Sequence, residues 1–290
     1  MASDPVYCPL RPVSGARHAQ NDGYESPCLL VAHMREILAA LAADELSVAE
    51  AEAALRGYAT GDHGRFDAAR EERRGIPEGI LATDKTPDEV ASLCVTAVET
   101  TGHAFITRTN DEHRQRITER MAATVPDATV DIDDRSAVVV VERASYEPPA
   151  IDATVGIVTA GTADAGPAGE AAAVVDAVGA TVKRIDDVGV ANLSRITDQV
   201  SALRTLDVII VAAGREGALP TVVAGLVDAP VIGLPISTGY GHGGNGEAAL
   251  AGLLQSCTVL SVVNIDAGFV AGAQASLIAQ SIAESAPMRE

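Results

Sequence analysis

Two short apolar runs near residue 220 constrain the fold more than any other part of the chain. Residues 207–213 and 229–235 are rich in Val and Ile and bounded by turn residues, so each is expected to form a buried strand. Residues 217–227 between them are expected to form a helix, with Pro220 in the first turn, where a missing N–H costs little. A strand, helix and strand of this length require parallel strands and a right-handed crossover. Ligands of such sheets bind at the carboxyl ends of the strands.

Strand and helix alternate in the same way through the C-terminal half of the chain. The expected strands are 154–159, 181–185, 207–213, 230–235 and 258–265, and the expected helices are 167–178, 191–204, 217–227, 246–256 and 269–283. Because each strand returns through a helix, the five strands should be parallel, with helices on both faces of the sheet. An α/β domain is therefore expected.

The N-terminal half has a different pattern and is expected to form a small α+β domain. Residues 31–56 have apolar side chains at helical spacing, and Ser47 with Glu50 forms a capping box that opens the second of two helices. Residues 86–89 mark another helix start. The expected strands are 103–109 and 138–142.

The prolines of residues 146–150 indicate a linker between the two halves. Residues 1–28 are rich in Pro, Ser, Asp and Asn without periodicity, which is typical of a flexible tail. The expected division is a tail over 1–28, an N-terminal domain over 29–149 and a catalytic domain over 150–290.

The chain is strongly acidic. Its 40 acidic and 21 basic residues give a net charge of −19, which argues against nucleic acid or an anionic membrane as its partner. Lys85 and Lys183 are the only lysines. An acid-rich, Lys-poor composition is typical of a halophilic cytoplasm, where salt screens self-repulsion, although a GC-rich genome would also favour Arg over Lys.

The four cysteines show neither CxxC pairing nor zinc-finger spacing with the six histidines, so no metal site and no disulfide framework are expected. The N-terminus lacks a basic region followed by an apolar core, and no later stretch is long and apolar enough to cross a membrane. These features indicate a cytoplasmic protein.

Candidate ligand-binding residues follow the first strand of the α/β domain. Gly161 lets the backbone approach a ligand, and Thr162 with the free N–H groups of the helix start can hold a phosphate or carboxylate. The spacing is not GxGxxG, so a conventional dinucleotide fingerprint is missing. The alternative is that Asp164 only caps a helix.

A second group of candidates follows the third and fourth strands. Gly214, Arg215 and Glu216 end the third strand, where the Arg and Glu form either a surface ion pair or part of a ligand site. The Gly-rich loop 237–246, which contains Gly239, Tyr240 and His242, is either a flexible connection or a lid over a small molecule.

Cys257 lies at the boundary between the fourth helix and the fifth strand. Most lone cysteines are inert buried hydrophobes, but a thiol beside polar loops can act as a nucleophile if its thiolate is stabilised. The residues alone thus predict an α/β enzyme acting on a small molecule, with two carboxylates and a candidate thiol.

Several segments resemble the LarB family, the pyridinium-3,5-biscarboxylate mononucleotide synthases of nickel-pincer cofactor biosynthesis. They are RFDAAREERRGIPEGILA, GTADAGPAGEAA, DVGVANLSRI, AAGREGALPTVVAGL, APVIGLPISTGYG and QSCTVLSVVNIDAGFVAG. The C-terminal half is also similar to the PurE family of aminoimidazole ribonucleotide mutases and carboxylases. The resemblance implies a PurE-like three-layer sandwich and a homo-octamer.

The chain departs from these families at two positions. PurE proteins carry a catalytic His directly before the Leu-Pro that follows the third strand, where this chain has Ala218. Ala163 replaces the Ser usual in both families, which removes one hydroxyl that could contact phosphate or carboxylate. Glu216 and Cys257 match positions that LarB proteins use.

The LarB resemblance implies that nicotinate adenine dinucleotide is carboxylated on its pyridinium ring and that its phosphoanhydride is hydrolysed to release AMP. It implies Cys257 as the nucleophile, Asp164 as a proton acceptor and Glu216 as a base for water. Positive charge for the dianionic substrate is expected from Arg215, and from Arg73 and Arg74 if these do not merely brace the domain interface. Carbon dioxide or bicarbonate is the co-substrate, and a requirement for Mg²⁺ stays open. The alternatives are a PurE-like carboxylase or mutase and a non-catalytic nucleotide sensor.

Overall fold

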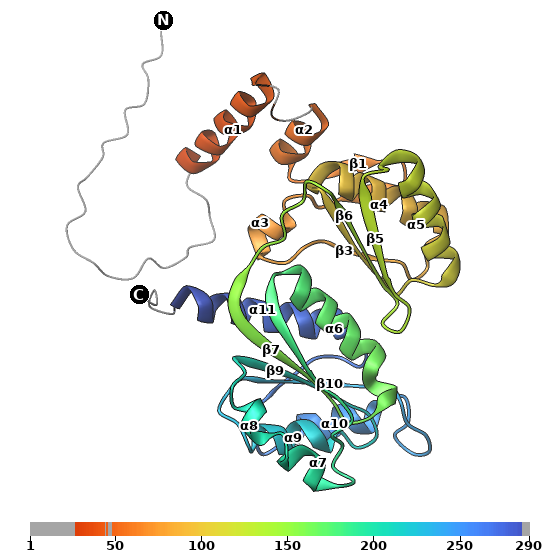
Figure 1. Ribbon diagram of the computed structural model, residues 1–290, viewed down its shortest axis with the longest axis vertical. Coiled ribbons are helices and arrows are strands. Elements are labelled where there is room, and N and C mark those ends of the chain that lie inside the picture. Colours follow the sequence, from red (N-terminus) through yellow and green to blue (C-terminus); the bar gives the residue numbers. More distant parts are fainter. Residues whose placement is uncertain (1–26, 44, 46–47, 286–290) are drawn as a thin grey trace, which may run out of the picture.

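The computed structural model describes residues 27–43, 45 and 48–285 (Figure 1). The proposed capping residue Ser47 and residues 1–26 of the proposed tail lie outside this part of the chain. Residues 27 and 28 of that tail belong to a helix, α1. Among the described residues, no helix is long and apolar enough to cross a membrane.

The C-terminal half contains the parallel sheet that the sequence predicts. Its five strands lie in the order β11-β10-β9-β7-β8, and every neighbouring pair is parallel. The strands are β7 (Ile151–Thr159), β8 (Ala180–Ile185), β9 (Val208–Ala213), β10 (Val231–Pro235) and β11 (Ser261–Val262). The helices are α6 (Ala165–Ala177), α7 (Leu193–Thr197), α8 (Val200–Leu203), α9 (Ala218–Ala224), α10 (Glu247–Leu254) and α11 (Gly268–Ser285).

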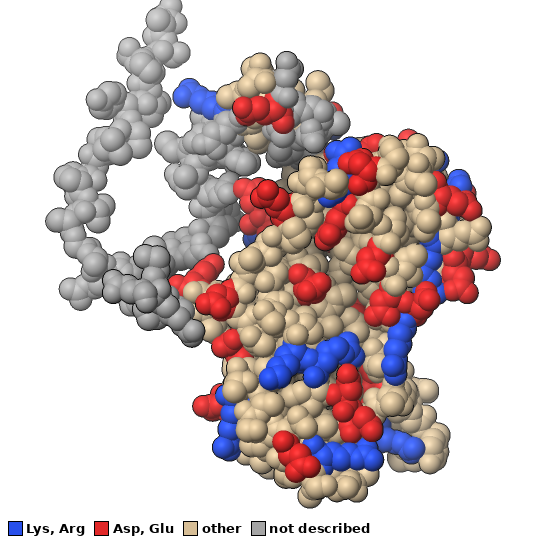
Figure 2. Space-filling model, in the orientation of Figure 1, with Lys and Arg blue, Asp and Glu red and all other residues tan. Residues whose placement is uncertain are grey.

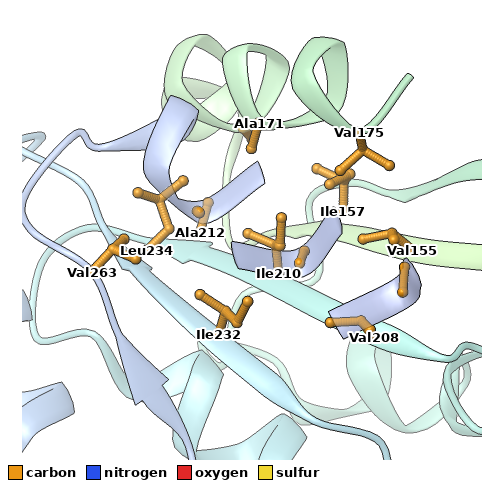
Figure 3. Packing of buried hydrophobic residues seen from close by; sticks show 14 of the residues in the cluster. Val155, Ile157, Ala171, Val175, Val208, Ile210, Ala212, Ile232, Leu234 and Val263 are labelled. Carbon is orange, nitrogen blue, oxygen red and sulfur yellow. The ribbon is translucent and has the colours of Figure 1, made fainter. Parts of the chain in front are cut away.

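Helices cover both faces of this sheet, so the expected three-layer α/β sandwich is confirmed. All six residues of β9 are buried because alternate side chains enter two different cores. Val208 and Ile210 pack under α6 and α11, as Figure 3 shows for this core. Ile209 and Val211 pack on the opposite side, with Ile196 of α7 and other helix residues. The central strand is therefore apolar along its whole length.

The N-terminal half forms an α+β unit around a mixed sheet of order β3-β4-β6-β5. Its strands are β3 (Gly79–Leu81), β4 (His103–Thr107), β5 (Ala128–Asp133) and β6 (Val138–Arg143). Helices α4 (Pro87–Thr101) and α5 (Asp111–Thr124) cover one face, with Cys94 and Met121 in the core between them. The remaining elements are α1 (Pro27–Ala42), α2 (Val48–Arg56), the hairpin β1 (Ala59–Gly61) and β2 (Gly64–Phe66), and α3 (Arg70–Arg74).

The second face of the N-terminal sheet packs on α6 and α11, which therefore lie between the two sheets (Figure 1). Phe105 of β4 meets Phe269 of α11 with ring centroids 5.7 Å apart. The two helices approach closely because their contact uses small residues: a Cβ on Gly272 would lie 2.6 Å from the carbonyl oxygen of Ala171. The Ala- and Gly-rich surface of α11 is thus covered within the chain.

Two predicted elements differ in the structure. The helix expected over 191–204 is divided into α7 and α8, and the polar pair Asp198 and Gln199 joins them. The strand expected over 258–265 forms only at Ser261–Val262, because β11 is an edge strand that pairs with β10 alone and Val259 before it is exposed.

Acidic side chains are spread over the face of the molecule shown in Figure 2, and a band of basic side chains crosses the C-terminal domain. The net charge of −19 is therefore not confined to one patch of that face.

Candidate active site

A pocket of about 390 Å³ lies at the carboxyl ends of the central strands. The chain passes from β7 to β8 on one side and then crosses back to β9 on the other, so the sheet reverses its direction of winding between β7 and β9. Ligands of parallel sheets bind at such a switch point. The walls are the loops that follow β7, β8, β9 and β10. The lining residues are 160, 161, 163 and 164 after β7, 189–191 after β8, 213–216, 218 and 219 after β9, and 238–240 after β10.

Asp164 is the buried acidic group of this pocket. Its carboxylate accepts a hydrogen bond from the Gly161 N–H at 2.7 Å and lies 3.4 Å from the Thr238 hydroxyl. The side chain is only 3% exposed, and this burial raises the pKa of Asp164, although the hydrogen bonds from Gly161 and Thr238 oppose the shift. A carboxylate with a raised pKa is a stronger base than an exposed one, which suits a proton acceptor.

Arg215 and Tyr240 pair at the rim of the pocket, with the guanidinium carbon 4.4 Å from the centre of the Tyr240 ring. Arg215 has a left-handed backbone with φ of +54°, and its N–H donates to the Thr238 carbonyl at 3.2 Å. The hydrogen bond and charge of Arg215 lower the pKa of Tyr240. Glu216 beside them is exposed and lines the pocket. The rim thus offers one cation, one phenol and one carboxylate to a ligand.

The structure brings most of the predicted site residues together. The predicted residues that line the pocket are Gly161, Asp164, Gly214, Arg215, Glu216, Gly239 and Tyr240. Thr162 and His242 do not line it. The Thr162 carbonyl instead accepts a hydrogen bond from Arg135 of the N-terminal domain at 2.6 Å, and the exposed His242 lies further along the Gly-rich loop.

Arg73 and Arg74 are not brought to this pocket within one chain. The Arg73 guanidinium pairs with Asp67 at 2.6 Å. Gly75, which directly follows Arg74, accepts a hydrogen bond through its carbonyl from Gln280, in the second half of α11. Because α11 begins near the carboxyl edge of the sheet and runs back toward the amino edge, this contact is remote from the pocket. The interface contact of this segment is made by the Gly75 carbonyl, while the Arg73 side chain pairs within the N-terminal domain.

Cys257 also lies outside the pocket of its own chain. It is exposed, on the loop between the end of α10 and the start of β11. That loop leads into the amino end of a strand, whereas the pocket lies at the carboxyl ends. The exposed side chains of Leu254 and Val259 flank the thiol along the chain, at 64% and 96% exposure.

Two family comparisons match this architecture. The family described as AIR carboxylase matches residues 154–288, and the family described as LarB/PurE-like N-terminal domain matches residues 58–143. An uncharacterized protein of Methanocaldococcus jannaschii is 36% identical over 220 residues, which cover 74% of this chain and 84% of that protein. The chain belongs to the LarB family. Its domains are those of carboxylase-type enzymes.

The structure locates the residue at which this LarB chain departs from the PurE pattern. Ala218, at the position of the PurE histidine, is the first residue of α9 and lines the pocket. A methyl group can neither donate nor accept a proton, so this wall offers no imidazole acid or base. The buried ionisable group in the pocket is Asp164 on the opposite loop.

Sequence reasoning missed the part of the LarB pocket that follows β8. Gly189, Val190 and Ala191 line it. A Cβ on Gly189 would lie 2.6 Å from the Ala160 carbonyl, so glycine allows this loop to pack against the end of β7. The sequence did indicate this loop, because the expected strand 181–185 ends at the same edge of the sheet as the other strands, and the loop after it is therefore expected at the same edge. Thr238, which contacts Asp164, was predicted only as part of the loop 237–246 and not as a site residue.

Among the residues that the structure describes, no group of three His, Cys, Asp or Glu side chains is arranged to hold a metal ion.

Proposed function

We propose that this LarB protein carboxylates the pyridinium ring of nicotinate adenine dinucleotide and hydrolyses the phosphoanhydride, which yields AMP and pyridinium-3,5-biscarboxylate mononucleotide. The observation that carries the proposal is the pocket itself, which joins a buried carboxylate, an exposed carboxylate and a guanidinium but has Ala218 in place of a proton-transferring histidine.

The carboxylation requires a nucleophile, because a pyridinium ring is electron-poor and does not attack carbon dioxide. A thiolate that adds to the carbon beside the ring nitrogen places an electron pair in an enamine. The enamine carbon then attacks carbon dioxide and forms the new C–C bond. Loss of the proton from that carbon to a base and departure of the thiolate restore the aromatic ring. We assign the thiolate to Cys257 and the base to Asp164.

The raised pKa of Asp164 supports this assignment. The carboxylate is held by the Gly161 N–H, so its position is fixed by the backbone of the turn after β7. Glu216, exposed at the rim, can take the proton from a water molecule that attacks the phosphoanhydride. Arg215 supplies the positive charge that a phosphate needs on an acidic protein.

The position of Cys257 adds a requirement to the proposal: the thiol must come from a second copy of the chain. Cys257 does not line its own pocket, and it lies between Leu254 and Val259, two large apolar side chains that are exposed in the single chain. Burial of these side chains against a neighbour would release their apolar surface from water. A homo-oligomer, with an octamer expected from the family, would thus both cover this surface and complete the site.

The test is to incubate the protein with nicotinate adenine dinucleotide and bicarbonate, with and without Mg²⁺, and to analyse the products by mass spectrometry. We expect AMP and a mononucleotide heavier by one carboxylate, with ¹³C incorporated from labelled bicarbonate. Absence of both products from a folded, oligomeric sample would overturn the proposal.

The second candidate function is that of a PurE-like aminoimidazole ribonucleotide carboxylase or mutase, which the AIR carboxylase match favours. Ala218 counts against it, since no imidazole is present to move the substrate proton. Expression of the chain in a purine auxotroph separates the two: rescue of growth would support this second function.

A further inference from the structure

A second cavity, of about 300 Å³, lies beside the pocket, between the N-terminal domain and the carboxyl edge of the parallel sheet. We call it the second chamber. Arg108 and Ser136 enter it from the N-terminal domain, and Pro167, Ile236, Ser237 and Asp266 enter it from the C-terminal domain. The pocket and the second chamber share Ala163 and Thr238 as a common wall.

Arg108 lines the second chamber with its backbone in a strained, left-handed conformation. It directly follows β4 and has a φ of +56°, a left-handed backbone that is uncommon for residues other than glycine. Its Nη2 donates a hydrogen bond to the Asp266 carbonyl at 3.0 Å, and its Nε lies 3.9 Å from Glu170. Glu170 is 4% exposed and accepts a hydrogen bond from the Thr107 hydroxyl. A buried carboxylate thus holds the guanidinium, which is half-exposed and keeps further N–H donors for a ligand.

Asp266 faces Arg108 and is also left-handed, with a φ of +53°. One carboxylate oxygen accepts the Ser237 N–H at 2.9 Å, and the other has no hydrogen-bond partner among the described residues. The hydroxyl of Ser136, a residue only 7% exposed, also has no hydrogen-bond partner among the described residues. Residues held in sparsely populated backbone regions gather at ligand sites, where the surrounding structure can maintain them.

These groups match one chemical class of ligand. A free carboxylate oxygen and two serine hydroxyls suit the hydroxyl groups of a ribose. The apolar side chains of Pro167 and Ile236 suit the face of a base, and a guanidinium suits a phosphate or stacks on a base. We infer that the second chamber binds the AMP half of the dinucleotide, an inference that rests on the proposed function.

The shared wall fits a substrate with two nucleotide halves joined by a phosphoanhydride. Each cavity alone is near the lower limit of about 300 Å³ for small-molecule sites. A dinucleotide that occupies both would place its anhydride over Thr238 and Ala163, next to Gly214 and the rim that carries Glu216. Hydrolysis at this point separates the two halves, and AMP then leaves from a chamber that the N-terminal domain helps to form.

The test measures the binding of AMP and of nicotinate mononucleotide separately by calorimetry. The variants are Arg108→Asn, whose side chain tolerates a left-handed backbone, Arg108→Lys, which keeps the charge, and Asp266→Asn. For Arg108→Asn we expect the Kd for AMP to rise about tenfold, the loss of one charge-assisted hydrogen bond, with the Kd for nicotinate mononucleotide unchanged. Arg116→Ala, at a surface pair with Asp88, is the control for a lost arginine.

Several outcomes would overturn the inference. One is AMP binding that is unaffected in Arg108→Asn and Asp266→Asn, and another is an equal loss of affinity for both mononucleotides. We expect wild-type protein to bind AMP and nicotinate mononucleotide simultaneously and the intact dinucleotide to displace both. AMP that the dinucleotide does not displace would indicate a separate regulatory site. Failure of the proposed function is distinguishable, because it appears as absence of AMP and of the carboxylated product with wild-type protein, whereas failure of this inference appears in the AMP affinity of the variants.

Discussion

The Thr238 hydroxyl lies 3.4 Å from the Asp164 carboxylate, so the loop after β10 touches the turn after β7 across the carboxyl end of β9. This contact joins the candidate base to the Gly-rich loop. It also stabilises the charged form of Asp164 and so opposes the effect of burial on the pKa of that carboxyl.

The first prediction concerns the pH dependence of carboxylation. Asp164 acts as a base only when ionised, so the rate should fall as the pH drops through its raised pKa. Thr238→Val removes a hydrogen bond to the charged form, so the pKa should rise further and the acidic limb should move to higher pH, by at most about one unit. The measurement is kcat/KM for the dicarboxylated product against pH. Thr238→Ser keeps a hydroxyl and should show the wild-type pH profile. If the acidic limb of the profile is the same in Thr238→Val and wild-type proteins, Asp164 is not the base.

Gly214 tests whether the two loops must approach closely. A Cβ at this position would lie 2.4 Å from the Thr238 hydroxyl oxygen and 2.6 Å from the Thr238 carbonyl oxygen. Gly214→Ala should therefore separate the loops, destabilise the protein by about 1–3 kcal/mol and reduce turnover. Denaturant unfolding and kinetics measure the two effects.

Gly239→Ala is the matched control for stability, because no atom lies within 4 Å of a Cβ built there. Its unfolding free energy should equal that of the wild type. A Gly214→Ala protein of wild-type stability would mean that the loops have room to adjust.

The parallel sheet could be predicted because β9 and β10 are buried on both faces, which leaves continuous apolar runs in the sequence. The gathering of Asp164, Arg215 and Glu216 followed from that topology alone. Helix α5 was missed because it buries only His113, Ile117 and Met121 and exposes many charged residues. Its Asn110 cap, which accepts the His113 N–H, was the available signal.

The contacts of the N-terminal domain with the site could not be predicted in the same way. Arg135 reaches the Thr162 carbonyl and Arg108 reaches that of Asp266, over separations of 27 and 158 residues. No local pattern encodes such pairs, because they depend on how the face of β4 and β6 packs on α6 and α11. For this reason the sequence predicted positive charge from Arg215, Arg73 and Arg74 but not from Arg108 or Arg135.

The acidic composition predicts that stability depends on salt. With a net charge of −19, the folded chain should be destabilised by self-repulsion at low ionic strength. Raising potassium chloride from 0.1 M to 1 M shortens the screening length from about 10 Å to about 3 Å, so the melting temperature should increase. Chloride is preferred to sulfate, since sulfate also strengthens apolar burial. A melting temperature independent of potassium chloride would favour genome composition as the reason for the scarcity of lysine.

The last prediction tests whether Cys257 acts in the pocket of a neighbouring copy. Cys257→Ser should abolish ring carboxylation, because an alcohol has no thiolate fraction at neutral pH, while release of AMP partly survives through Glu216. Asp164→Asn should also prevent carboxylation.

If Asp164 and Cys257 of one site come from different chains, co-expression of the two variants creates pockets with both groups intact, and random mixing should restore about one quarter of the wild-type rate. Light scattering must show assemblies larger than the 29.7 kDa chain. Val259→Glu, which places a charge in the proposed interface, should dissociate them and abolish carboxylation. If both variants are inactive alone and the co-expressed oligomer is equally inactive, the thiol does not come from a second copy. If Cys257→Ser itself forms the product at the wild-type rate, covalent catalysis by this cysteine is excluded.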